Sequence, residues 1–111
     1  MNKLLKIAIY LLILLGVIHS GFTFLIYKSA SIDALWFFGT GLCYIFMGLY
    51  NLAAIKVKIQ SISRMAVVLN FVGTAFTIAI TYILREPQAY IALFLVIAIF
   101  LASIFNQTET D

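Results

Sequence analysis

Four long apolar stretches run through the chain, each separated from the next by a few polar residues. They cover about residues 4–27, 34–55, 62–84 and 88–105. An α-helix rises about 1.5 Å per residue, so roughly 20 apolar residues cross a hydrocarbon layer about 30 Å thick. The apolar residues are continuous instead of alternating with polar ones, which predicts helices and not strands. We therefore predict an all-α fold: a membrane-spanning antiparallel four-helix bundle that forms a single domain over residues 1–111.

The polar interruptions contain residues that are typical of helix ends. Asp33 follows the first interruption, and a carboxylate is favourable in the opening turn of the second helix. Pro87 follows Arg85 and Glu86, and proline suits the first turn of a helix, where its missing N–H is not needed. Connections this short place consecutive helices side by side in opposite directions.

The composition indicates that lipid covers most of the surface of the protein. Hydrophobic residues make up 65% of the chain and charged residues 10%, whereas soluble domains average roughly 45–50% and about 25%. The charges lie at the ends of the apolar stretches and do not form a basic patch, which argues against a nucleic-acid partner. A single cysteine, Cys43, excludes an internal disulfide and a site built from several cysteines.

The distribution of lysine and arginine predicts an orientation in the membrane. Five of these residues fall on one side and two on the other; the five are Lys3, Lys6, Lys56, Lys58 and Arg64, and the two are Lys28 and Arg85. Basic residues favour the cytoplasmic side. We therefore expect a multi-pass protein of the bacterial inner (plasma) membrane with both termini in the cytoplasm. We also expect the first stretch to be retained as a span and not cleaved as a signal peptide, because it is long enough to cross the bilayer.

Small and polar residues recur at helical spacing within three of the four stretches. The first helix carries Gly16, His19 and Thr23; the second carries Gly41, Tyr44, Gly48 and Asn51; the third carries Asn70, Gly73, Thr74, Thr77 and Thr81. Such stripes mark faces where helices approach closely and bond to each other, and they also suit a polar ligand pocket between helices. The fourth helix has no comparable stripe, so we expect it to be the most lipid-exposed.

His19 is the polar residue whose role is most open. An imidazole can bind a metal or haem, transfer a proton or contact a ligand head group; alternatively, it bonds to a threonine or to Tyr44 of a neighbouring helix. One histidine and one cysteine do not supply the three or four ligands of a usual metal site. We predict no catalytic residue, no metal and no cofactor, and we expect Cys43 to be a small buried apolar residue.

Three segments of the first two helices carry a resemblance to known proteins. They are residues 16–19 (GVIH), 34–41 (ALWFFGTG) and 48–51 (GLYN). In these segments the chain resembles small bacterial four-helix membrane proteins of uncharacterised function, which sets His19, Trp36 and Asn51 apart as a group without implying an activity. The length and number of spans are also similar to those of small multidrug resistance transporters, which work as dimers around a glutamate in the first helix. This chain has no acidic residue in its first span.

These observations favour a non-enzymatic membrane protein. We expect it to bind a lipid-like ligand or a partner membrane protein between its helices, with the lipid bilayer as its surroundings and a homodimer as a further option. The predicted polar contacts are His19, Tyr44, Asn51, Asn70 and Thr77. The alternative is a dimeric small-molecule transporter, although no Asp, Glu, Lys or Arg lies in the middle of a span. An enzyme acting on a lipid or quinone is favoured least, because no acid–base pair is evident.

Overall fold

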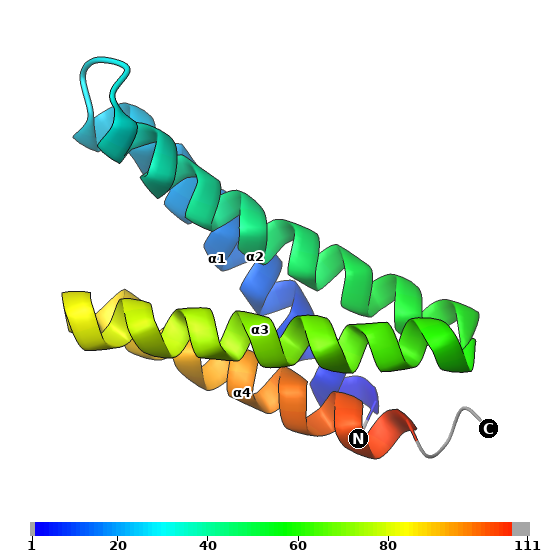
Figure 1. Ribbon diagram of the computed structural model, residues 1–111. Helices are drawn as coiled ribbons and strands as arrows, with labels where there is room; N and C mark the ends of the chain where they lie inside the picture. Colours follow the sequence, from blue (N-terminus) through cyan, green and yellow to red (C-terminus); the bar gives the residue numbers. More distant parts are fainter. Residues whose placement is uncertain (1, 108–111) are drawn as a thin grey trace.

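The computed structural model describes residues 2–107, and this part of the chain is all-helical (Figure 1). It contains α1 (Asn2–Ile26), α2 (Ile32–Val57), α3 (Gln60–Leu84) and α4 (Pro87–Gln107). Each helix is long and apolar enough to cross a membrane. The prediction of an all-α fold with four helices long and apolar enough to span a membrane is therefore confirmed, and the four predicted ranges agree with the helices to within a few residues.

The helix ends explain why the connections are so short. Ser31 is the N-cap of α2, where its Oγ accepts a hydrogen bond from the Ala34 N–H at 3.1 Å. Lys58 and Arg85 end α2 and α3 in the left-handed conformation, and each backbone N–H donates to a carbonyl in the preceding turn. As predicted, Asp33 lies in the first turn of α2 and proline begins α4. Each helix is thus stopped and the next one started within two to five residues.

The four helices pack as two hairpins. α1 packs most extensively against α2 and α3 against α4, while the smaller α1–α4 and α2–α3 contacts join the hairpins. Figure 1 shows the hairpins diverging toward the α1–α2 and α3–α4 loops and converging toward the other end, where both chain ends lie. Within the described residues, the backbone of α1 does not come close to that of α3, nor that of α2 to that of α4. The separation of the two hairpins therefore increases toward one end.

Glycines bring α1 and α2 into close contact. A Cβ added to Gly16 would lie 2.6 Å from the Gly41 carbonyl oxygen, and one added to Gly48 would lie 2.3 Å from Ile13 Cγ1. No side chain fits in these gaps, so the small residues of the predicted stripes determine how closely the two backbones approach. Gly21 and Gly39 have no atom within 4 Å of an added Cβ and have no such role.

The apolar core lies toward the end where the hairpins converge. Its fully buried members include Ile9 and Leu12 of α1 and Val96 and Ile99 of α4. The expectation that the fourth helix is the most lipid-exposed is wrong, because 33% of the α4 span is buried and only 17% of the α3 span. The reason is physical: alanine and branched aliphatic side chains suit a packed core and lipid equally well, so an apolar stretch without polar residues does not show which it contacts.

Candidate functional site

Polar side chains gather at two levels of the bundle, and the first lies near the converging end. Asn51 of α2 and Asn70 of α3 form a reciprocal pair, in which each Nδ2 donates to the other's Oδ1 at 2.7 and 2.8 Å. Asn70 Nδ2 also donates to Ser103 Oγ of α4 at 3.1 Å, and Asn51 Nδ2 donates to the Met47 carbonyl at 2.8 Å. All three polar side chains are buried. We call these three residues the polar junction, because they connect α2, α3 and α4.

The polar junction satisfies its own hydrogen-bonding groups. An amide side chain has two N–H donors and one carbonyl acceptor, and both asparagines use all of these on protein atoms. Ser103 Oγ in turn donates to the Phe100 carbonyl at 2.7 Å. With no amide donor left over, the arrangement suits a fixed connection between helices better than a ligand contact.

A second link between α2 and α3 involves two of the predicted residues. The Tyr44 hydroxyl and Thr77 Oγ1 are 2.6 Å apart, and Thr77 Oγ1 donates its one hydrogen to the Gly73 carbonyl at 2.7 Å. Tyr44 must therefore be the donor in the bond between them. The Tyr44 ring belongs to the apolar core and also lines the cavity described next. It thus separates the packed end of the bundle from the open end.

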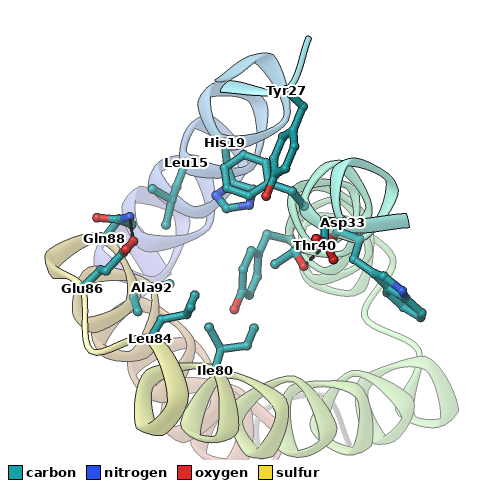
Figure 2. A pocket seen from close by; sticks show the side chains of 14 residues that line it. Leu15, His19, Tyr27, Asp33, Thr40, Ile80, Leu84, Glu86, Gln88 and Ala92 are labelled. Atoms are coloured by element: carbon teal, nitrogen blue, oxygen red, sulfur yellow. Dashed lines mark hydrogen bonds between the residues drawn. The ribbon is translucent and has the colours of Figure 1, made fainter. Parts of the chain in front are cut away.

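A cavity of about 250 Å³ lies between the two hairpins on the open side of Tyr44. All four helices or their loops contribute to its wall, as Figure 2 shows. Its deeper wall is mainly apolar and includes Leu15, Ile80 and Ala92. The polar lining residues are His19, Tyr27, Asp33, Thr40, Tyr44, Glu86 and Gln88. A concave, mostly apolar site with a few polar groups is typical of ligand pockets, although this cavity is slightly smaller than their usual range of roughly 300–1,000 Å³.

His19 lies on the α1 wall of this cavity. Its imidazole stacks on the Phe37 ring of α2, with ring centroids 3.9 Å apart and an angle of 18° between the planes. Figure 2 shows the ring at the edge of the space between the hairpins. Its Nε2 is buried and has no hydrogen-bond partner among the described residues. The expected bond from His19 to a threonine or to Tyr44 is therefore not formed.

Two carboxylates flank the cavity near the loops. Asp33 belongs to the first turn of α2, and Glu86 lies in the α3–α4 loop and accepts a hydrogen bond from Gln88 Nε2. Figure 2 shows Asp33 on one hairpin and Glu86 on the other, with the cavity between them. Neighbouring Arg85 is engaged elsewhere, because its guanidinium lies over the Tyr82 ring, 5.5 Å from the centroid, and its Nε donates to the Tyr82 carbonyl.

A second, almost wholly apolar groove lies between α1 and α4. Its volume is about 530 Å³, and it is lined by Leu11, Leu14, Leu15, Ile18, Tyr90, Ile91, Phe94 and Leu95. Leu15 also lines the cavity between the hairpins. The groove and the cavity therefore share one lining residue.

No protein-family model, curated protein or solved structure matches this chain. The site must therefore be interpreted from its own geometry. Within residues 2–107, no group of three His, Cys, Asp or Glu side chains could hold a metal ion.

The structure brings some of the predicted residues together and separates others. His19 and Tyr44 line the cavity, and Thr77 is bonded to Tyr44. Asn51 and Asn70 form the polar junction with Ser103, a residue that the sequence did not single out. Sequence reasoning also missed Phe37 and assigned Asp33 and Glu86 only to helix ends. These three residues lie beside the cavity because the two hairpins diverge. A pattern within one helix does not predict this divergence.

Cys43 does not occupy the position expected of it. The sequence analysis predicted a small buried residue, but the cysteine is exposed on the outer face of α2. It directly precedes buried Tyr44, and adjacent residues on a helix point about 100° apart. Because Gly41, Tyr44 and Gly48 occupy the buried face of α2, Cys43 lies outside that face and is exposed.

Proposed function

We propose that this protein crosses the membrane as an antiparallel four-helix bundle and binds a lipid-like, amphipathic ligand in the cavity between its hairpins. The excess of lysine and arginine near the termini and the α2–α3 loop supports a cytoplasmic location for these parts, in the inner membrane of a bacterium. The open end of the cavity then faces the opposite side. The proposed role is binding, without chemical conversion of the ligand.

The observation that carries this proposal is the cavity with His19 Nε2 at its wall. A buried polar atom without a partner costs roughly 1–3 kcal/mol, and the described residues offer Nε2 none. A polar group of a bound molecule would remove this cost once the His19 ring turns toward it, because protein atoms now cover Nε2. The surrounding apolar wall at Leu15, Ile80 and Ala92 suits a hydrocarbon body better than a fully polar molecule.

The apolar groove between α1 and α4 supports an amphipathic ligand in particular. Leu15 lines both the cavity and the groove, so the two spaces are neighbours, and a movement of this side chain is the step that we propose connects them. A ligand with its polar part in the cavity would then place its hydrocarbon chain against Ile18, Phe94 and neighbouring residues, on the surface that we assign to lipid. In this arrangement the polar part of the ligand stays among polar side chains, and its hydrocarbon chain stays among apolar side chains and lipid.

Native mass spectrometry of the protein released from its own membrane in a mild detergent tests this proposal. We expect a defined extra mass on the wild-type protein, and its loss in Ala92→Leu, which adds bulk to the wall of the cavity. Ala79→Leu is the matched control, because it makes the same change at an exposed position of α3. The proposal is wrong if the wild-type protein carries no extra mass, or if both variants retain it equally.

A dimeric small-molecule transporter is the second candidate. It is supported by the shape of the bundle, in which the hairpins diverge at one end and are joined by the polar junction at the other. Rocking of two such halves around a central site is one way to alternate access. Flux of a substrate in proteoliposomes, abolished by Ala92→Leu and kept in Ala79→Leu, would favour transport over binding alone.

A further inference from the structure

We infer that the ligand of the cavity carries a cationic head group, held between Asp33 and Glu86 and against the aromatic rings beside them. This inference rests on the proposed function, since it specifies the ligand of the same cavity. It concerns the sign of the head group's charge, which the proposed function leaves open.

The charged residues of the wall support a cation. Among residues 2–107, Asp33 and Glu86 are the only ones lining the cavity that carry a formal charge besides the titratable His19, and no lysine or arginine of this range lines it. The two basic residues near this end, Lys28 and Arg85, are not part of the wall, and the Arg85 side chain is engaged by Tyr82. An anionic head group would meet two like charges there and no counter-charge.

The helix dipoles do not reverse this result. Asp33 and Glu86 both lie at the start of a helix, where the dipole contributes about half a positive charge. However, α1 and α3 end at these same two loops, and a helix C-terminus contributes about half a negative charge. The four dipole charges at this end therefore cancel approximately, and within the cavity wall itself the two carboxylates determine the sign of the formal charge.

Aromatic rings on the same wall also favour a cation. Tyr27 and Phe37 line the cavity with ring centroids 5.6 Å apart, and Phe37 is stacked on His19. Trp36 also belongs to the lining, although most of its side chain is exposed. A cation within about 6 Å of a ring centroid is attracted by the ring face, and quaternary ammonium groups are recognised in this way. Rings and carboxylates lie near the loops and the aliphatic wall lies deeper, so the head group points outward and the hydrocarbon chain inward.

Trp36 provides a direct reporter for the test, because it is the one tryptophan of the chain and it lines the cavity. The full-length protein in neutral dodecyl maltoside micelles is titrated with a dodecyltrimethylammonium that carries bromine at carbon 3, next to the head group and therefore near Trp36, whose fluorescence bromine quenches at short range. The matched probe is dodecyl sulfate with bromine at carbon 3, which has the same chain and quencher but an anionic head. Partition into the micelle gives a linear background with either probe, so only the saturable quenching is counted as binding.

We expect the ammonium probe to bind about tenfold more tightly than the sulfate probe, because each exposed carboxylate contributes a factor of a few. The double variant Asp33→Asn with Glu86→Gln should remove this preference. The double variant Glu109→Gln with Asp111→Asn makes the same change in net charge and should keep it. Helical content and elution volume confirm that each variant is folded before it is titrated.

The possible results separate the two proposals. Saturable quenching that is equal for both probes, or tighter for the sulfate, overturns the cationic head group and leaves the cavity as a ligand site. A preference for ammonium that survives the double variant shows that the carboxylates do not recognise the head group, and also overturns the inference. No saturable quenching by either probe contradicts the proposed binding function itself, and the inference fails with it.

Discussion

The crossing of α1 and α2 gives the sharpest test of the packing, because two glycines of α2 differ only in what surrounds them. A Cβ added to Gly41 would lie 2.6 Å from the Gly16 carbonyl oxygen and 2.0 Å from Ser20 Oγ. Ordinary contacts of a Cβ are 3.4–4 Å. Two residues earlier, a Cβ added to Gly39 would have no atom within 4 Å. The comparison of Gly41→Ala with Gly39→Ala therefore isolates the effect of contact with α1.

The expected magnitudes follow from these distances. In Gly41→Ala the helices must separate or Ser20 must move, and overpacking of this kind costs about 1–3 kcal/mol. Movement of Ser20 also breaks its hydrogen bond to the Phe38 carbonyl, now 3.0 Å, for about 0.6 kcal/mol. Alanine recovers roughly 0.5–1 kcal/mol through its better helix propensity. We therefore expect Gly41→Ala to lower the free energy of unfolding by about 1–3 kcal/mol and Gly39→Ala to raise it by up to about 1 kcal/mol.

Titration with sodium dodecyl sulfate from dodecyl maltoside micelles measures both values, with helical content followed by circular dichroism. The midpoint should fall for Gly41→Ala and stay level or rise for Gly39→Ala. Equal midpoints for the two variants would refute the reasoning, because the close approach of α1 and α2 would then not depend on the absence of a side chain at Gly41.

Two further predictions concern the polar junction and the topology. Asn51→Ala and Asn70→Ala should each lower the free energy of unfolding by about 2 kcal/mol, since each leaves a buried amide unpaired. The double variant should lose about 1 kcal/mol less than the sum of the two single variants. Strict additivity in the detergent titration would show that the two asparagines do not interact. Labelling of intact cells with a membrane-impermeant maleimide tests the orientation, in a variant that lacks the native cysteine. A cysteine at Lys28→Cys should be labelled and one at Lys58→Cys should not. The opposite result would show that the proposed orientation is inverted.

The helices could be predicted because their signals are local. A continuous apolar stretch must form its own backbone hydrogen bonds in lipid, so its length alone indicates a helix. Asp33 and Pro87 mark helix starts through effects within one turn of chain. The stripes on the second and third helices also identified buried faces correctly, since Tyr44, Asn51, Asn70 and Thr77 are all buried. Spacing along one helix is sufficient to show which residues share a face.

The cavity could not be predicted in the same way, because it depends on the angle between the hairpins. Asp33 and Glu86 are far apart in the chain, and each has a complete local explanation as a residue at a helix end. His19 was recognised as unusual, but its stacking on Phe37 requires the register of α1 against α2. Whether the chain belongs with small four-helix membrane proteins of uncharacterised function stays a prediction.

The location of the core and polar junction at one end, and of the cavity at the other, makes the protein suitable for redesign of its specificity. Residues such as Asp33, Glu86 and Gln88 are exposed and belong to neither the apolar core nor the polar junction. Substitutions there are expected to change stability by no more than about 0.5 kcal/mol. The cavity mouth can therefore be varied as a combinatorial library while the remainder of the bundle is kept constant as a scaffold.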